Sequence, residues 1–255
     1  MQSFVDRVVS DSAFQATFSN VPTDFALVEL DSLVVFQKFI NLGFVQALKA
    51  TMSASPDVAE VARIAFGLDR PEPPVTIRQA GNGVYQFVSP SNDIRPLEVN
   101  LVQPSKVADF KTSGRAQAFV AMAVGFGSNY LNAFQIEGRL VLNNGSHRAY
   151  ALRSLGITHA PCIVQQVASR DELDLVAAGE FQQNPDRYLK VSRPSMLRDY
   201  FDPLLTRVFP VARKNRMVQV QVAASCRMIS TRGRWVKSEP PIDRGQYNQF
   251  ARKPG

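Results

Sequence analysis

The residues of this chain that are best suited to bind a phosphate lie between positions 144 and 148. Asn144-Gly145-Ser146-His147-Arg148 follows the apolar run 140–142. Glycine adopts a positive φ at little cost, and serine is a good helix N-cap. Such a turn directs free backbone N–H groups and the positive end of a helix dipole to one point. Because His147 and Arg148 add side-chain donors in the first helical turn, the pattern predicts an anion site.

The elements that must position this turn can be read on either side of it. Residues 131–136 and 140–142 predict a β-hairpin around Glu137-Gly138, and we expect Glu137 to serve that turn. Ala149, Leu152 and Leu155 form the apolar stripe of a short helix that ends at Gly156, and 160–164 predicts a further strand.

A purely structural role for the same residues is the alternative. Turns that join a strand to a helix through glycine are common in proteins. Arg148 could pair with a structural carboxylate, and His147 could hydrogen-bond to a loop carbonyl. The residue pattern alone leaves both interpretations open.

A family resemblance bears on this choice. Gly145-Ser146-His147-Arg148, the helix that ends at Leu155-Gly156 and the strand Ala160-Pro161-Cys162-Ile163-Val164 together resemble the ParB/sulfiredoxin-like superfamily. The resemblance covers residues 140–164 and extends weakly back to about residue 97. Members share a strand, a Gly-x-His-Arg or Gly-Glu-Arg-Arg turn, a short helix and a strand entered through Ile-Pro, where this chain has Ala160.

The resemblance implies nucleotide binding, with ATP or CTP and Mg²⁺ as the expected ligands. Asn144 and Gly145 would hold the phosphates, and Ser146, His147 and Arg148 would be the catalytic residues. The superfamily includes CTP-hydrolysing partition proteins, ATP-using sulfinic acid reductases, a free-serine kinase and nucleases.

This chain departs from three of these groups at a motif position. Sulfiredoxins have Cys in place of Ser146, so their thiol chemistry is not expected here. The kinase has an acid in place of Asn144, and the partition proteins have Glu-Arg in place of Ser146-His147 together with a helix-turn-helix domain that is not found here after Val164.

Two segments could supply the remaining groups of a phosphoryl-transfer site. Val28 to Leu33, with Glu29, Asp31 and nearby Lys38, could be the family's first strand-and-helix element. The segment 104–107 is the alternative, with Lys106 and Lys111 near the phosphates, and its distance from the motif fits better. Each of these residues could instead be a surface charge.

Charge is uneven along the chain. Residues 1–180 carry 14 Lys and Arg against 17 Asp and Glu, a net of −3, whereas residues 181–255 carry 15 against 5, a net of +10. A basic C-terminal third favours DNA or RNA as a partner. The candidate contacts are Arg213, Lys214, Arg216, Arg232, Arg234 and Trp235. The alternative is a solvated basic segment.

Other functional classes are disfavoured by composition. Two cysteines and two histidines make a zinc site improbable, and we expect Cys162 and Cys226 to be small buried apolar residues. No stretch has the length and apolar character of a signal peptide or a membrane-spanning helix, so we expect a cytoplasmic protein without membrane contact.

The expected fold is α+β, a small mixed-sheet ParB/sulfiredoxin-like domain at 75–180 between a helical N-terminal region (1–74) and a basic C-terminal extension. Residues 181–229 should form a helix-and-strand extension packed on the domain, with a mobile tail at 230–255. Strands are expected at 25–30, 75–78, 84–88, 97–102 and 217–222, and helices at 33–50, 56–65, 106–124, 171–178 and 195–208. Residues 34–36 could instead extend a strand, and Pro203 could kink or split the last of these helices.

Three functions follow as hypotheses. The first is a nucleotide- or phosphate-binding protein that hydrolyses a nucleoside triphosphate or transfers its phosphoryl group. The second is a nucleic-acid-binding protein or nuclease that uses the same turn and the basic C-terminal third. The third is a non-catalytic interaction scaffold.

Overall fold

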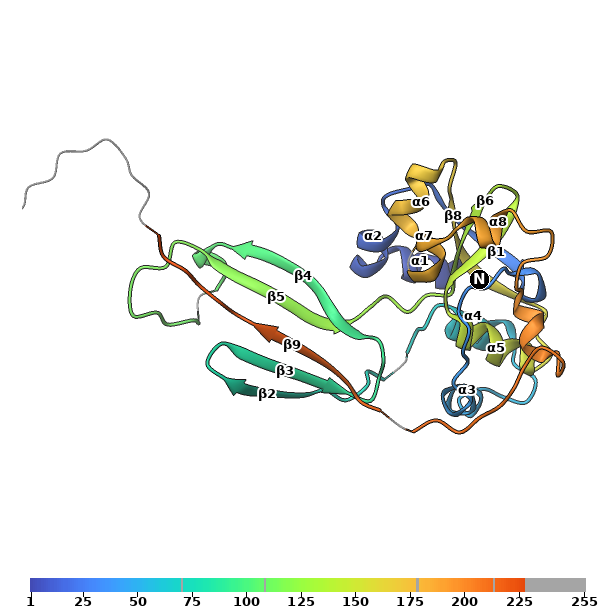
Figure 1. Cartoon of the computed structure of the whole chain (residues 1–255), viewed down its shortest axis with the longest axis horizontal. Helices are drawn as coiled ribbons and strands as arrows, with labels where there is room; N and C mark the ends of the chain where they lie inside the picture. The colour runs from blue at the N-terminus through green and yellow to red at the C-terminus, as the bar shows by residue number, and fades with distance from the viewer. Residues whose placement is uncertain (70, 108, 178, 213, 228–255) are drawn as a thin grey trace, which may run out of the picture.

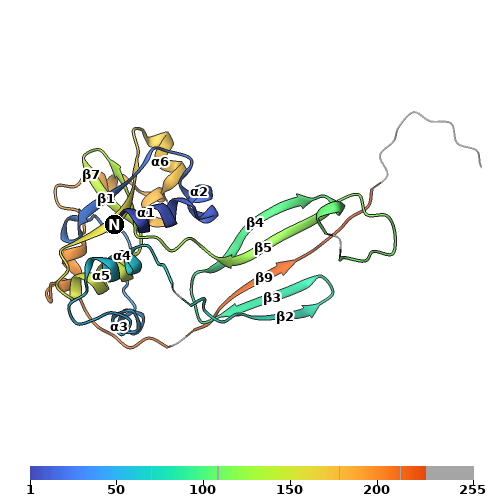
Figure 2. The ribbon, with the colours of Figure 1, turned by 180° about the vertical axis from the view of Figure 1, so that it is seen from behind.

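The computed structural model describes residues 1–69, 71–107, 109–177, 179–212 and 214–227. The chain forms a compact body and a long β arm that extends from one side of it (Figures 1 and 2). Helices and mixed sheets together make the fold α+β, as the sequence predicted.

A four-stranded mixed sheet lies at the centre of the body, in the order β1-β8-β6-β7. Its strands are β1 (Thr23–Glu29), β6 (Asn132–Ile136), β7 (Arg139–Asn144) and β8 (His159–Gln166). β8 runs antiparallel to β1 and parallel to β6, and β6 and β7 form the predicted hairpin. Glu137 (φ 48°) and Gly138 (φ 74°) are both left-handed, as a two-residue hairpin turn requires.

Helices cover both faces of this sheet. Leu33, Val45, Leu152 and Cys162 belong to a core cluster that involves α3, α4 and α5, whereas Phe134 and Phe181 belong to a second cluster with α6, α7 and α8. The helices are α1 (Gln2–Val9), α2 (Ser12–Phe18), α3 (Leu42–Lys49), α4 (Val58–Ala65), α5 (Ser146–Ser154), α6 (Arg170–Val176), α7 (Gly179–Gln183) and α8 (Asp186–Leu189), with 3-10 turns at Leu30–Ser32, Pro104–Lys106 and Leu197–Phe201.

The arm is made of two small sheets. One has three strands in the order β2-β3-β9, namely β2 (Thr76–Gly81), β3 (Val84–Ser89) and β9 (Arg216–Gln221); the other is the hairpin of β4 (Ile94–Val102) and β5 (Phe119–Phe126). β9 follows the body in sequence and returns to pair antiparallel with β3. The three-stranded sheet of the arm is therefore completed by β9, which lies more than a hundred residues after β3 in the chain.

Three predicted helices are wrong in extent or in kind. Residues 119–124 of the helix expected at 106–124 belong to β5, where Val120, Met122 and Val124 alternate with alanines opposite β4. The helix expected at 33–50 begins only at Leu42, and the alternative of extended chain at 34–36 holds for Val34, which bridges to Val141 and Met196. Only the short turn Leu197–Phe201 forms within 195–208, ahead of Pro203.

The domain boundaries also differ from the expected ones. Residue 75 marks the start of the arm, and the N-terminal region is part of the body because β1 pairs with β8 throughout its length. A sheet can be built from segments that are remote in sequence. The boundary expected at residue 75, which was taken from local composition, therefore separated β1 from β8, although the two strands pair in one sheet. The tail expected at 230–255 lies outside the described residues.

Candidate functional site

Gly145 separates β7 from α5, and two constraints require a glycine there. Its φ is +97°, in the left-handed region. A Cβ at this position would lie 2.6 Å from Cδ1 of Leu131, closer than real side chains approach. The turn Asn144–Arg148, called the α5 turn from here on, is thus fixed by backbone conformation and by packing together.

The start of α5 has no side-chain cap. Its N-cap residue is Gly145, which offers no side-chain oxygen, and its first turn contains no acidic residue. Four other helices of the body are capped by a side-chain oxygen; the capping residues are Asp11 for α2, Asn41 for α3, Asp57 for α4 and Ser169 for α6. The positive end of the α5 dipole therefore lacks the side-chain oxygen that caps α2, α3, α4 and α6.

Two side chains of the α5 turn are buried. Ser146 is 5% exposed and Arg148 is 4% exposed. The guanidinium of Arg148 lies beside Gly67, where a Cβ would be 3.3 Å from Nη2 and 2.6 Å from the carbonyl oxygen of Asn129. Gly67 follows the C-terminal end of α4, so the cation lies near the negative end of that helix dipole as well as near the positive end of α5.

His147 is held as a hydrogen-bond acceptor. Its Nε2 accepts from the backbone N–H of Asn41 at 2.9 Å, and its ring packs edge-on against Phe44 with 5.4 Å between centroids. An accepting Nε2 carries no proton, which places the proton of the neutral ring on Nδ1. Burial lowers the pKa of His147, and the positive charge of Arg148 lowers that pKa further. The sequence suggested a loop carbonyl as the partner of His147, whereas the partner in the structure is the backbone N–H of Asn41.

The segment that returns from the arm lies against the α5 turn. Asn144 Nδ2 donates to the carbonyl of Ser128 at 3.1 Å, and Leu131 packs on Gly145. Nothing local in the sequence indicated that Asn41, Gly67 or Ser128 would meet the motif, because each arrives from a distant part of the chain.

A cleft of about 270 Å³ lies at the same root of the arm. Its lining includes Asp11, Gly67, Glu72, Ser128 and Tyr130. The phenol of Tyr130 donates to Asp11 Oδ2 at 2.6 Å, and burial together with this carboxylate raises the pKa of Tyr130. Two carboxylates line the cleft, so an anionic ligand is better served by the α5 turn itself than by this cleft.

The structure does not bring Lys106 and Lys111 to the α5 turn. Both belong to the connection between β4 and β5, at the end of the arm that lies away from the body (Figure 1). The alternative segment, 28–33, ends β1 and lies beside α5, where Asp31 pairs with Arg153 at 2.7 Å. Lys38 pairs with Glu180 at 2.7 Å. Sequence distance favoured the segment 104–107, but the arm, inserted between α4 and β6, carries this segment away from the α5 turn.

The basic C-terminal cluster lies mostly outside the described residues, which exclude Arg213, Arg232, Arg234 and Trp235. Lys214 is exposed, and Arg216 donates to the carbonyl of Asn92 at 2.6 Å. These two residues lie at the beginning of β9 and are not part of the α5 turn.

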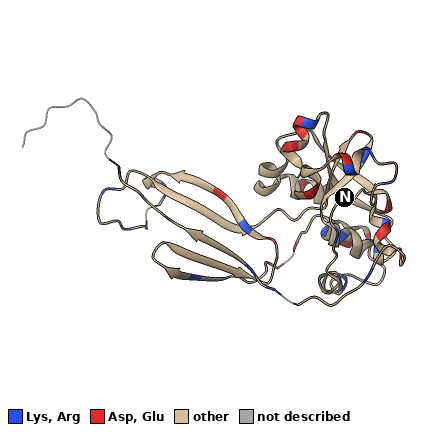
Figure 3. Cartoon of the chain, in the orientation of Figure 1, with Lys and Arg blue, Asp and Glu red and all other residues tan. Residues whose placement is uncertain are grey.

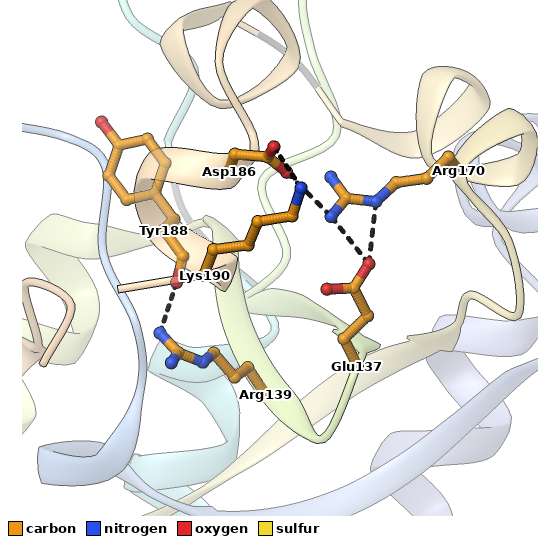
Figure 4. A network of polar contacts seen from close by, with 6 residues as sticks. All are labelled: Glu137, Arg139, Arg170, Asp186, Tyr188 and Lys190. Atoms are coloured by element: carbon orange, nitrogen blue, oxygen red, sulfur yellow. Dashed lines mark hydrogen bonds and ion pairs between the residues drawn. The ribbon is translucent and has the colours of Figure 1, made fainter. Parts of the chain in front are cut away.

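A second polar cluster ties the β6–β7 hairpin to α6 and α8 (Figure 4). Arg170 pairs with Glu137 at 2.7 Å and with Asp186 at 3.0 Å, and Lys190 pairs with Asp186 at 2.6 Å. A shallow groove of about 420 Å³ lies beside them. Every one of these charges is paired and solvent-accessible, a pattern typical of structural surface contacts, which are weak because solvent screens them.

Other chemistry-bearing residues are dispersed. In the part of the chain that the structure describes, no three His, Cys, Asp or Glu side chains gather in a way that could hold a metal ion. Cys162 is buried as expected, and burial raises the pKa of its thiol; Cys226 is exposed, contrary to expectation. None of the described helices is both long enough and apolar enough to cross a bilayer.

Comparison with family models, with curated proteins and with solved structures finds no match to this chain. The fold and site define an α+β protein with a glycine turn at the start of an uncapped helix. The resemblance to the ParB/sulfiredoxin-like superfamily stays a prediction that rests on the residues of the α5 turn and on the helix and strand that follow them.

Proposed function

We propose that this protein binds a phosphate-bearing ligand, a nucleotide, at the α5 turn. The observation that carries the proposal is the uncapped start of α5 at Gly145, with a buried arginine in its first turn. Backbone N–H groups at a helix N-terminus favour an anion, and an arginine beside them adds a charge-assisted donor.

Three residues give the α5 turn its access to solvent. Asn144, Gly145 and His147 are half-buried, whereas Ser146 and Arg148 lie beneath them. A phosphate would therefore meet the backbone of residues 145–147 first, with the Arg148 charge behind it. His147 would contribute as a neutral ring, because its Nε2 is already engaged with Asn41. We assign no metal ligand or general base, so the proposal concerns binding; Mg²⁺ would arrive with the nucleotide.

Isothermal titration of the full chain with ATP, CTP, GTP and ADP, each with Mg²⁺, tests the proposal. We expect at least one of them to bind with a Kd below 1 mM, a free energy of about −4 kcal/mol or better. The proposal would be contradicted if none of the four nucleotides, and pyrophosphate likewise, gave any heat of binding at millimolar concentration.

Two variants locate the binding at the α5 turn. Asn144→Asp keeps the side-chain shape but places a carboxylate beside the phosphate and loses the donation to the Ser128 carbonyl, so we expect affinity to fall at least tenfold, with circular dichroism showing that the fold is kept. Arg148→Ala should abolish binding; circular dichroism must show that this buried position tolerates the change. Arg153→Ala is the matched control, because Arg153 lies on the same helix but pairs with Asp31 away from the turn. Equal loss in the control would reject the α5 turn as the site.

A further inference from the structure

β5 has one hydrogen-bonded edge and one open edge. It pairs with β4, and no other described strand is hydrogen-bonded to it. Natural proteins protect such edges with charged residues, prolines or bulges. β5 contains neither a charged residue nor a proline, and the irregularity in this hairpin falls on β4, between Pro96 and Glu98. Figure 3 shows that β5 carries no blue or red residue.

Five residues of β5, at positions 120–124, are symmetric about Met122. Val120-Ala121-Met122-Ala123-Val124 reads identically in both directions. In an antiparallel pair of two copies, Met122 would face Met122, Ala121 would face Ala123 and Val120 would face Val124. A twofold axis relates identical surfaces, so each of the five residues 120–124 finds a partner of its own size across the axis.

From the open edge and the symmetric sequence, we infer that β5 pairs antiparallel with β5 of a second copy of this chain, about a twofold axis at Met122. The two hairpins then form one four-stranded sheet in the order β4-β5-β5-β4. This inference goes beyond the proposed function, because the arm residues that carry it lie outside the α5 turn.

Apolar side chains on one face of the hairpin support the pairing. Val99 lies opposite Met122 and Leu101 opposite Val120, which places all four side chains on the same face. They are 58%, 40%, 78% and 74% exposed, respectively. An isolated two-stranded hairpin is marginally stable in water, whereas a four-stranded sheet adds backbone hydrogen bonds and Val–Val and Met–Met contacts across the axis.

Register-specific disulfide formation tests this geometry. In a Cys226→Ser background, which removes the exposed native thiol, Met122→Cys should give a disulfide-linked dimer under mild oxidation, because directly opposed Cα atoms lie about 4.5–5.5 Å apart. Ala121→Cys alone should not, because its symmetric mate is offset by two residues and lies about 8 Å away. A mixture of Ala121→Cys with Ala123→Cys should cross-link again.

Charged substitutions of Met122, the residue on the proposed axis, provide an independent test. Size-exclusion chromatography with light scattering should show a concentration-dependent dimer for the native chain. Met122→Lys and Met122→Glu should each raise its Kd at least tenfold, since like charges meet on the axis, and an equimolar mixture should restore dimers. Circular dichroism spectra must be unchanged.

Three results would overturn the inference. One is a monomer at all concentrations up to several hundred micromolar. Another is equal cross-linking of Met122→Cys and Ala121→Cys, which would indicate face-to-face contact or random collision instead of this register. The third is a dimer that tolerates both charged variants, which would place the interface elsewhere or leave the β5 edge to a different protein.

Discussion

Nε2 of His147 accepts a hydrogen bond of 2.9 Å from the backbone N–H of Asn41. The bond joins the first turn of α5 to the N-cap of α3, and Asn41 in turn accepts from Phe44 N through its own side chain at 3.1 Å. Two helix starts thus meet at one imidazole ring. Its protonation would replace an acceptor by a second donor facing the Asn41 N–H, so the contact depends on a neutral ring.

The first prediction is a pH dependence of stability. In the unfolded chain His147 titrates near its ordinary pKa of about 6.5, whereas burial lowers this pKa in the folded chain. Below about pH 6.5 the unfolded state therefore binds more protons, and the contribution of His147 to stability is present above this pH and is lost as the pH falls. The loss is limited to about 1.4 kcal/mol per pH unit.

Urea denaturation of the native chain and of His147→Gln, at intervals between pH 7.5 and 5, measures the effect. Glutamine can accept from Asn41 but does not titrate in this range, so the difference between the two curves isolates the imidazole. Parallel curves would show that His147 titrates alike in the folded and unfolded states.

The second prediction compares two glycines with similar backbone conformations. Gly145 has φ +97° and Gly156 has φ +83°, but only a Cβ at Gly145 would meet Leu131, at 2.6 Å. Gly156→Ala should cost about 1–2 kcal/mol for the left-handed backbone. Gly145→Ala should cost about 2–5 kcal/mol, because overpacking adds to the same backbone cost. Chemical denaturation of both variants gives the difference, and equal losses would show that Leu131 moves aside freely.

The third prediction concerns the N-cap of α4. Asp57 accepts from Glu60 N at 2.8 Å, and the Glu60 carboxylate accepts from Asp57 N at 3.2 Å, which completes a capping box. Asp57→Ala should destabilise the protein by about 1 kcal/mol, and Asp57→Ser by less, because serine retains a capping oxygen. Thermal unfolding ranks the three proteins; a serine variant no more stable than the alanine variant would argue against the cap.

The fourth prediction addresses the root of the arm. The Tyr130 hydroxyl donates to Asp11 Oδ2 at 2.6 Å and joins the start of α2 to the segment that returns from β5. Tyr130→Phe should cost about 1 kcal/mol, and a double-mutant cycle with Asp11→Asn should give a coupling energy of the same sign. A coupling energy of zero would mean that the two side chains act independently.

Much of the candidate site could be predicted from the sequence, because its determinants are local. A glycine that needs positive φ, a run of alternating apolar residues and a short amphipathic stretch act over a few residues. They correctly predicted the β6–β7 hairpin, α5 and β8. The uncapped start of α5 was predicted wrongly: Ser146 was expected to be the N-cap, whereas the helix begins at Ser146 and its N-cap is Gly145, which offers no side-chain oxygen.

Tertiary structure alone decided what surrounds the turn. Burial of Arg148 beside Gly67, the contact of Asn144 with Ser128 and the acceptor role of His147 all join residues at least 16 positions apart. The placement of Lys106 and Lys111 depended on whether residues 76–126 fold into the body or extend from it. The local sequence pattern of a strand is the same in both arrangements, so the sequence did not indicate which of them the chain adopts. The sequence by itself determined that a strand, a left-handed glycine and a helix would follow one another at the α5 turn. Only long-range packing decided which side chains this turn meets and which of its groups remain exposed.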